Sequence, residues 1–434
     1  MKEPGILMKN QNDPVLRVGI ISDVQGYNYA QDWGMHNLEK ALNMLERMDI
    51  DVLIMAGDLA DYGDDNNAIA YYQDMIKKIF RRKMPIHAAC AGNHDFWTHH
   101  ESKTQEQCYK DFCAALEEPC DNPLLKTING YDFIMLSSDN KQNYSAQDCE
   151  KLRPLLEQSK AKDPQKPIFV ITHKQAFDTV AGSYGADGSK ALRQVLNDYP
   201  QVVSFSGHSH RPLEDERCIW QKEFTAINTS TLSYGCVEND PVNVTGAIVP
   251  FAREVVQMEY MEVFADRLEI HRYNVEDERE IKPDKLWTVS LPYSPEKAIY
   301  NDQRAQQRSA PKFKPGTEIY VRHDFGFTFL IFEGAEHEDF THFYKIRIIP
   351  LSPDGEQGEA MEHLYLSNFY RLKRNQDHRQ VFKMPPHTLE PGKRYRFEVY
   401  PIETFGNTGK PIVLETAISQ YYFYQNVEDV FPQE

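Results

Sequence analysis

The sequence predicts a stacked α/β domain followed by an all-β sandwich, and three observations lead to this fold class. Over residues 1–210, short apolar runs alternate with segments whose apolar residues recur at helical spacing. Several of these runs end in Asp, Asn or His, and sites in α/β proteins form at the carboxyl ends of strands. The last part of the chain instead carries short alternating segments separated by turn signals, which are typical of a β-sandwich.

The α/β pattern begins with an apolar run over 15–22, which we expect to be a buried strand. Leu38, Ala41, Leu42 and Leu45 then recur at the spacing of one helix face, so we expect a helix over 35–48. The same criteria predict strands at 51–56, 86–91, 131–136, 168–171 and 202–205, helices at 68–80, 108–116 and 147–158, and a hairpin of 254–264 with 268–273.

The composition changes after this pattern, at residues 283–315. This segment is rich in Pro, Lys, Gln and Arg, so we expect it to connect two domains. Strand-like alternation follows at 318–322, 343–349 and 394–399. The predicted organisation is a tail over 1–14, a first domain over 15–282, the connection, a β-sandwich over 316–420 and a tail over 421–434.

Composition and charge restrict the function. The 65 acidic and 48 basic residues give a net charge of −17, which argues against general binding of nucleic acid or of anionic membranes. No apolar run approaches the roughly 20 residues of a membrane-spanning helix. The first 14 residues lack the apolar stretch of a signal peptide, so we expect a cytoplasmic protein, or an exported one if the start is processed.

Five short motifs carry the chemistry, and nearly every one follows an apolar run. A pair of divalent cations needs oxygen and nitrogen ligands from several separate loops, and together the motifs supply them. The motifs are Asp23-Val24-Gln25, Gly57-Asp58-Leu59-Ala60-Asp61, Gly92-Asn93-His94-Asp95, Thr172-His173 and Gly207-His208-Ser209-His210.

The residue types suit a site for two metal ions. A ligand shared by two cations must be an anionic carboxylate, and Asp58 at a strand end suits that task. Asn93 offers an amide oxygen, and the imidazoles of His173, His208 and His210 offer nitrogen atoms. Any single motif has a simpler interpretation, such as a cap or loop carboxylate for Asp23 or a core histidine for His173. Five motifs in order favour the metal site.

With these motifs, the chain over about residues 15–275 resembles the calcineurin-like metallophosphoesterase superfamily, whose pattern is D-x-H, G-D-x-x-D, G-N-H-[DE], H and G-H-x-H. The resemblance implies a layered α/β/β/α sandwich that holds two cations. It implies that His94 protonates the leaving oxygen or, with Asn93, holds the phosphate, that Asp95 orients the imidazole, and that Asp61 supports the site through hydrogen bonds. The implied ligands are Asp23, Gln25, Asp58 and His210 for one ion, and Asp58, Asn93, His173 and His208 for the other.

Gln25 departs from the family pattern, which has His at this position. Its amide oxygen is a harder ligand than imidazole, so we expect a preference shifted towards Mn²⁺ or Mg²⁺. We therefore expect two divalent ions, Mn²⁺ first, with Fe, Zn²⁺, Mg²⁺ and Ni²⁺ as alternatives. The D-x-Q variant resembles that of the manganese-dependent ADP-ribose/CDP-alcohol diphosphatases, although Gly26 here precedes Tyr27. This resemblance implies a nucleotide-type diphosphate substrate.

Two features leave alternatives open. Phe96 and Trp97 follow the third motif and could either stack on a substrate base or pack in the core. The segment 389–395, which ends in Tyr395, resembles the part of fibronectin type III domains that contains a tyrosine corner, and 405–407 resembles that class as well.

The sequence therefore predicts a hydrolase that cleaves a small-molecule phosphate ester or diphosphate, with a metal-bridging hydroxide attacking phosphorus in line. The alternative is a catalytically weak or inactive metal-binding protein whose β-sandwich binds a partner. The sequence contains no motif that identifies a protein partner.

Overall fold

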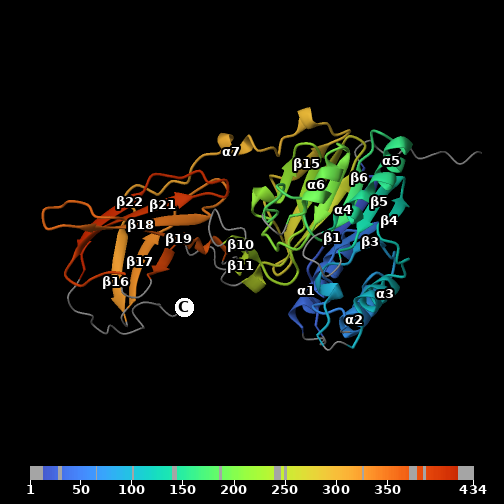
Figure 1. Ribbon diagram of the computed structural model, residues 1–434, viewed down its shortest axis with the longest axis horizontal. Helices are drawn as coiled ribbons and strands as arrows, with labels where there is room; N and C mark the ends of the chain where they lie inside the picture. The colour runs from blue at the N-terminus through green and yellow to red at the C-terminus, as the bar shows by residue number, and fades with distance from the viewer. Residues whose placement is uncertain are drawn as a thin grey trace, which may run out of the picture. The chain divides into compact units, whose positions relative to one another are not determined.

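The computed structural model describes residues 13–27, 32–64, 66–99, 102–138, 144–184, 188–238, 246–248, 252–324, 327–370, 379–384 and 388–418. The chain divides into two compact units, residues 1–302 and residues 303–434 (Figure 1). The tail expected at 421–434 and nearly all of the tail expected at 1–14 lie outside the described residues.

The first unit contains two large sheets. One has the strand order β14-β13-β12-β1-β2-β3, with β15 paired to β13. Strands β1, β2 and β3 run parallel, and β12 joins β1 antiparallel. The expected hairpin forms from β12 and β13. The bounds are β1 (Leu16–Ile21), β2 (Val52–Ala56), β3 (Ile86–Cys90), β12 (Gln257–Val263), β13 (Arg267–Asn274), β14 (Arg279–Glu280) and β15 (Trp287–Ser290).

The other sheet has the strand order β4-β5-β6-β7-β9-β8. Its central strands β5, β6, β7 and β9 run parallel, so their carboxyl ends lie at one edge. A separate small hairpin joins β10 (Cys236–Glu238) and β11 (Gly246–Ile248). The bounds in the sheet are β4 (Leu124–Ile128), β5 (Tyr131–Leu136), β6 (Ile168–Thr172), β7 (Val202–Ser206), β8 (Ile219–Gln221) and β9 (Thr225–Asn228).

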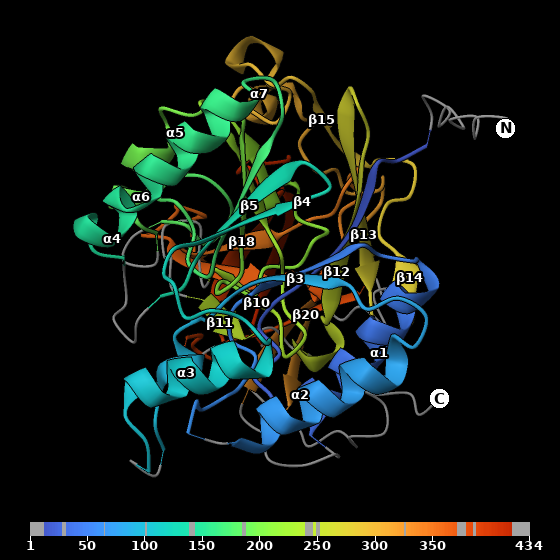
Figure 2. The ribbon, with the colours of Figure 1, turned by 90° about the vertical axis from the view of Figure 1, so that its right-hand side faces the viewer.

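Helices cover the outer face of each sheet, which gives the α/β/β/α layering that the motifs imply (Figure 2). Apolar residues of α1, α2 and α3 pack on the first sheet, and those of α4, α5 and α6 on the second. The two sheets bury a further core between them. The bounds are α1 (Trp33–Arg47), α2 (Asn66–Ile79), α3 (Gln105–Ala115), α4 (Ala146–Glu150), α5 (Leu152–Lys162) and α6 (Lys190–Leu196).

Local sequence explains where these elements start. The Asp32 carboxylate accepts a hydrogen bond from the backbone N–H of Met35 and caps α1, after which Leu38, Ala41 and Leu45 face the core. All of β2 is buried, as expected for a central parallel strand. None of the described helices has the length and apolar character to span a membrane.

The segment 283–315, which we expect to connect two domains, differs in part from that expectation. Residues 287–290 form β15, which pairs with β13. Trp287 and Val289 are buried in the core between the sheets, and this burial holds the strand in the first unit. The Pro- and Lys-rich composition around the strand concealed its alternation. The division between the units falls later, at residues 302 and 303.

The second unit is a β-sandwich of two antiparallel sheets, with the orders β16-β17-β20 and β19-β18-β21-β22. A core that includes Leu330, Phe332, Ile346 and Phe397 joins them. The Tyr395 hydroxyl accepts a hydrogen bond from the backbone N–H of Glu390 at 3.0 Å, the contact expected of a tyrosine corner. The bounds are α7 (Arg304–Gln307), β16 (Ile319–Asp324), β17 (Phe327–Glu333), β18 (Phe343–Leu351), β19 (Met361–Leu366), β20 (Arg379–Lys383), β21 (Arg394–Ile402) and β22 (Ile412–Ala417).

Candidate metal centre

The predicted ligands lie in the turns that follow the parallel strands, and their backbone is unusual. Asp23, Gln25, Asp58, His208 and His210 all have φ between 46° and 66°. This left-handed region is uncommon for residues other than glycine. Such conformations cost free energy and cluster at functional sites, where the surrounding structure maintains them. The fold therefore holds five predicted ligands in strained turns at one edge of the sheets.

Asp58 lies at the centre of the site and is 1% exposed. Its Oδ2 lies 3.1 Å from His173 Nε2 and 4.0 Å from His94 Nε2, while its Oδ1 accepts the His94 backbone N–H at 2.9 Å. Burial alone would raise the pKa of this carboxyl group, but the imidazoles of His173 and His94 hold the pKa well below its usual range. Asp58 is thus an anionic group at neutral pH.

Two histidines are oriented by backbone carbonyl oxygens. His173 Nδ1 lies 2.8 Å from the Ala56 carbonyl oxygen, and His210 Nδ1 lies 2.8 Å from the Tyr234 carbonyl oxygen. A carbonyl oxygen only accepts, so each Nδ1 carries the proton and donates it. Each Nε2 then faces a carboxylate, Asp58 for His173 and Asp23 for His210, the latter at 3.0 Å. Metal-binding histidines are commonly held in this way, with one ring nitrogen donating to a protein oxygen and the other left to bind the ion.

The remaining predicted ligands surround these pairs. Asn93 Oδ1 lies 3.1 Å from His173 Nε2, and the rings of His173 and His208 have centroids 5.0 Å apart. The backbone N–H of His208 donates to both oxygens of Asp23, at 3.1 and 2.9 Å. Gln25 joins the site through its backbone N–H, which donates to the Asp58 carbonyl oxygen at 2.9 Å. The structure therefore brings all seven predicted ligands to one edge.

Two motif glycines make this close approach possible. A Cβ atom on Gly92 would lie 2.1 Å from Asp58 Oδ1, and one on Gly57 would lie 2.5 Å from His173 Nδ1. Gly57 also has φ of +90°, which L residues rarely adopt. A side chain at either position would displace a predicted ligand.

His94 has a different partner from the one we expect. Its Nδ1 lies 3.2 Å from Asp61 Oδ1 and 3.0 Å from the Asp61 carbonyl oxygen. Burial lowers the pKa of His94, but the hydrogen bond to Asp61 and the charge of Asp58 outweigh it and raise the pKa to about 9. In this structure the residue beside the imidazole Nδ1 is therefore Asp61, and the described hydrogen bonds of the Asp95 carboxylate go to backbone N–H groups instead.

Asp95 instead ties the motif turns together. Its carboxylate accepts the backbone N–H groups of Asp58, Ala60 and Gly92, each at 2.9 Å. The side chain is 3% exposed, and burial, together with the nearby charge of Asp58, raises its pKa to about 7. His94 begins a single 3₁₀ turn, η1 (His94–Phe96), in which consecutive side chains point in different directions. This turn directs Asp95 away from the imidazole of His94.

The donor set fits divalent cations. Ligand atoms of Asp23, Asp58 and His173 lie within 4.8 Å of one another, and all three residues are buried. Among the described residues, neither Asp23 nor Asp58 forms an ion pair with Lys or Arg. Two buried carboxylates without a Lys or Arg partner, beside imidazole nitrogens, form a donor set that suits divalent cations.

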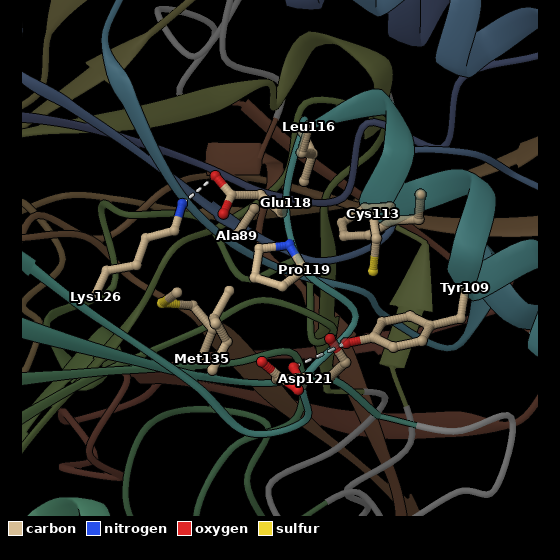
Figure 3. Close-up of a pocket in the computed structure, with 12 residues that line it drawn as sticks. Ala89, Tyr109, Cys113, Leu116, Glu118, Pro119, Asp121, Lys126 and Met135 are labelled. Atoms are coloured by element: carbon tan, nitrogen blue, oxygen red, sulfur yellow. Dashed lines mark hydrogen bonds and ion pairs between the residues drawn. The ribbon is translucent and has the colours of Figure 1, made fainter.

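Two other features do not belong to this site. Glu262, Glu269 and His271 form a second group within 4.8 Å, but they are half-buried and lie on β12 and β13. A pocket between α3 and strands β3, β4 and β5 contains Tyr109, Cys113, Glu118 and Lys126, with Lys126 and Glu118 joined by an ion pair (Figure 3). None of the motif residues lines that pocket.

Sequence reasoning missed the carbonyl oxygens of Ala56 and Tyr234 that orient the two histidines. Backbone acceptors carry no residue signature, so no sequence signal could have found them. The sequence did indicate that Asp61 belongs to the site, because the second motif contains it. It does not show which carboxylate the imidazole of His94 faces.

Comparisons with known proteins find similar sequences and structures. Residues 16–212 match the family model described as calcineurin-like phosphoesterase. A protein of Ruthia magnifica subsp. Calyptogena magnifica, named "Probable cyclic nucleotide phosphodiesterase", is 25% identical over 204 residues, which cover 45% of this chain and 79% of that protein.

Two solved structures are similar at lower identity. A dimetal phosphatase from Danio rerio is 13% identical with a TM-score of 0.43, and the match covers 65% of this chain and 100% of that one. A purple acid phosphatase from yellow lupin is 15% identical with a TM-score of 0.46, and the match covers 65% and 55%.

Proposed function

We propose that this chain is a phosphoester hydrolase that uses two divalent cations to cleave a nucleotide-type phosphate ester or diphosphate. The match of residues 16–212 to the calcineurin-like phosphoesterase model supports the hydrolase class. The observation that carries this proposal is the buried group of Asp23, Asp58 and His173, which has no Lys or Arg partner among the described residues. A fixed negative charge at a strand edge is suited to cation binding.

The proposed ligands remain those that the motifs imply. One cation takes Asp23, Gln25, Asp58 and His210, and the other takes Asp58, Asn93, His173 and His208. The oxygen-rich set with Gln25 favours Mn²⁺. When bound, such cations supply a nucleophile by lowering the pKa of water, and they neutralise phosphate charge.

The protein's own groups complete the reaction in this proposal. His94 has its pKa raised to about 9, so it carries a proton at neutral pH and can donate it from Nε2 to the leaving oxygen. Asp61 holds Nδ1 and thereby keeps Nε2 directed towards the site. Asp95 has a positioning role, because its carboxylate accepts the backbone N–H groups of Asp58 and Gly92 and so holds the turns that contain them.

The nucleotide character rests on two likenesses. The D-x-Q motif at Asp23-Val24-Gln25 resembles that of nucleotide-type diphosphatases, and the bacterial relative is named for cyclic nucleotides. The net charge of −17 makes a small nucleotide a better substrate than a polynucleotide. We keep 316–420 as the proposed extent of the β-sandwich.

The test is hydrolysis of bis-p-nitrophenyl phosphate with and without Mn²⁺. We expect turnover that requires the metal and that Asn93→Ala abolishes, while Asn43→Ala on the exposed face of α1 retains it. His94→Ala should reduce kcat by about 10²–10⁴-fold, the range for a positioned general acid.

Full turnover by Asn93→Ala would refute the proposal. Absence of turnover in folded, metal-loaded protein with this ester and with nucleotide diphosphates would favour the inactive metal-binding alternative.

A further inference from the structure

A row of aromatic rings extends outward from His94. The ring of Trp97 lies against the imidazole of His94, with centroids 3.9 Å apart. Tyr62 follows, 6.4 Å from Trp97, and it stacks on His99 at 4.9 Å. Tyr27 meets Tyr62 edge to face at 6.4 Å. We call Tyr27, Tyr62, Trp97 and His99 the aromatic wall.

Two hydrogen bonds from backbone N–H groups hold the aromatic wall in place. The N–H of Gly63 donates to the Trp97 carbonyl oxygen at 2.8 Å, and the N–H of His99 donates to Asp64 Oδ1 at 2.9 Å. These two bonds join the loops that carry the rings. The aromatic wall is therefore organised before any ligand binds, which reduces the entropy cost of binding.

The exposure of the side chains distinguishes the rings of the aromatic wall from rings that pack in the core. Phe96 is buried and stacks on Tyr109 at 5.5 Å, whereas the neighbouring Trp97 is 39% exposed. The two residues therefore differ in the question left open by the sequence, which was stacking on a base or packing in the core. Phe96 packs in the core, and Trp97 is exposed beside His94. Large aromatic faces exposed next to a site are typical of ligand binding.

We propose that the aromatic wall binds the base of a nucleoside carried on the leaving oxygen. This inference rests on the proposed phosphohydrolase function, in which His94 protonates that oxygen, and it adds a subsite for the leaving group. Every nucleobase offers a flat π face that stacks on aromatic side chains without charged contacts. The group released beside His94 therefore leaves along the row of rings.

The extent of the aromatic wall distinguishes a nucleoside from a simple aryl group. A base is separated from the leaving oxygen by ribose, so it reaches past Trp97 to Tyr62 and His99. The ring of an aryl ester is bonded directly to the leaving oxygen, so it contacts Trp97 alone. Among the described ring contacts, Tyr62 pairs with Trp97 and His99 and not with His94, so a substitution there tests base binding separately from the acid.

The experiment measures binding of AMP, ribose 5-phosphate and phenyl phosphate to the full chain with Mn²⁺, by calorimetry, each ligand being used as the phosphonate in which CH₂ replaces the ester oxygen so that none is hydrolysed. AMP and ribose 5-phosphate differ only by the base. We expect AMP to bind more tightly, and Tyr62→Leu to weaken AMP by about 10-fold, within the range of base stacking on one aromatic residue. The affinities for ribose 5-phosphate and phenyl phosphate should be unchanged.

Tryptophan fluorescence gives a second readout. Trp220 and Trp287 are buried, and Trp33 donates its indole N–H to the Arg253 carbonyl oxygen, so Trp97 is the ring placed to report on AMP. AMP should quench the emission of the unmodified protein and of Trp33→Phe, but not that of Trp97→Phe.

Equal affinities for AMP and ribose 5-phosphate would overturn the inference, as would equal weakening of all three ligands by Tyr62→Leu. If Tyr62→Leu does not fold, His99→Ala at the outer edge provides the same comparison. Loss of metal-dependent hydrolysis would instead overturn the proposed function, and the binding measurements remain interpretable in that case.

Discussion

Two clusters in the first unit contain the same kinds of residue, yet only one has the character of a metal centre. Asp23, Asp58 and His173 bring two carboxylates and an imidazole within 4.8 Å, and so do Glu262, Glu269 and His271. The first cluster is buried in turns at strand ends, and the second is half-buried on two regular strands. Residue type and proximity therefore do not decide which cluster binds cations.

The difference lies in how the negative charge is neutralised. In the second cluster, Arg267 Nε lies 2.6 Å from Glu269 Oε1 and Arg17 Nε lies 3.9 Å from Glu262 Oε1. In the first cluster, the described partners of the two carboxylates are imidazoles and backbone N–H groups. Arginine side chains therefore neutralise the second cluster, whereas the described partners of the first include no Lys or Arg, and it is there that we propose that divalent cations bind.

The largest effect that separates the clusters should come from Asp58→Asn. The substitution removes the one carboxylate proposed to serve both ions, so we expect activity at background and loss of bound metal. Metal analysis after gel filtration and the Mn²⁺-dependent ester assay measure the two effects. Retained metal together with retained turnover would place the site elsewhere.

A smaller effect should separate Asp61 from Asp95. Because Asp61 orients His94, Asp61→Asn should lower kcat by about 10- to 100-fold with little change in melting temperature. Asp95 accepts three buried backbone N–H groups, so Asp95→Asn should lower the free energy of unfolding by about 2 kcal/mol or more. Steady-state kinetics and chemical denaturation of both variants test the assignment, which fails if the two effects are exchanged.

The pH dependence of stability should distinguish metal-free from metal-loaded protein. Burial lowers the pKa of His173, but the carboxylate of Asp58 outweighs it and raises the pKa to about 9 in the metal-free state. An imidazole in an unfolded chain titrates near about 6.5, so the added stability is complete below that pH and is lost as the pH rises through about 9.

An imidazole bound to a metal is neutral, so loading with Mn²⁺ should remove this loss. Thermal unfolding at a series of pH values, with and without Mn²⁺, measures it. If the melting temperature of the two forms depended on pH in the same way, the proposal that His173 binds a metal ion would be contradicted.

The smallest effect should come from the second cluster. Glu262 is partly exposed and pairs with Arg17 at 3.9 Å, so Glu262→Gln should change the free energy of unfolding by about 0.5 kcal/mol or less. Bound metal and turnover should equal those of the unmodified protein. A loss of metal in this variant would remove the distinction between the clusters.

The sequence could predict that these residues lie together, because they follow apolar strands. Asp23 lies two residues after the end of β1, Asp58 lies two residues after the end of β2, and His173 directly follows β6. Parallel strands bring their carboxyl ends to one edge. The order of the motifs along the chain therefore indicated which residues lie close together in the folded protein. The layered fold followed from the same alternation of strand and helix.

Other features depended on contacts that the sequence does not show. His94 contacts Asp61 rather than Asp95 because of the single 3₁₀ turn at His94–Phe96, and the side-chain directions in this turn have no sequence signature. Strand β15 was hidden in the segment 283–315 because its four residues lie within a Pro- and Lys-rich composition that concealed their alternation. The aromatic wall joins Tyr27 to residues beyond position 60 only through tertiary structure.

The central claim is that the cluster of Asp23, Asp58 and His173, which has no Lys or Arg partner among the described residues, binds two divalent ions. Its most direct test is the metal stoichiometry of three matched proteins after loading with Mn²⁺: the unmodified chain, Asp58→Asn and Glu262→Gln. We predict about two ions per chain in the first and third proteins. We predict a marked loss in Asp58→Asn. Equal stoichiometry in all three proteins, or a loss confined to Glu262→Gln, would contradict the account.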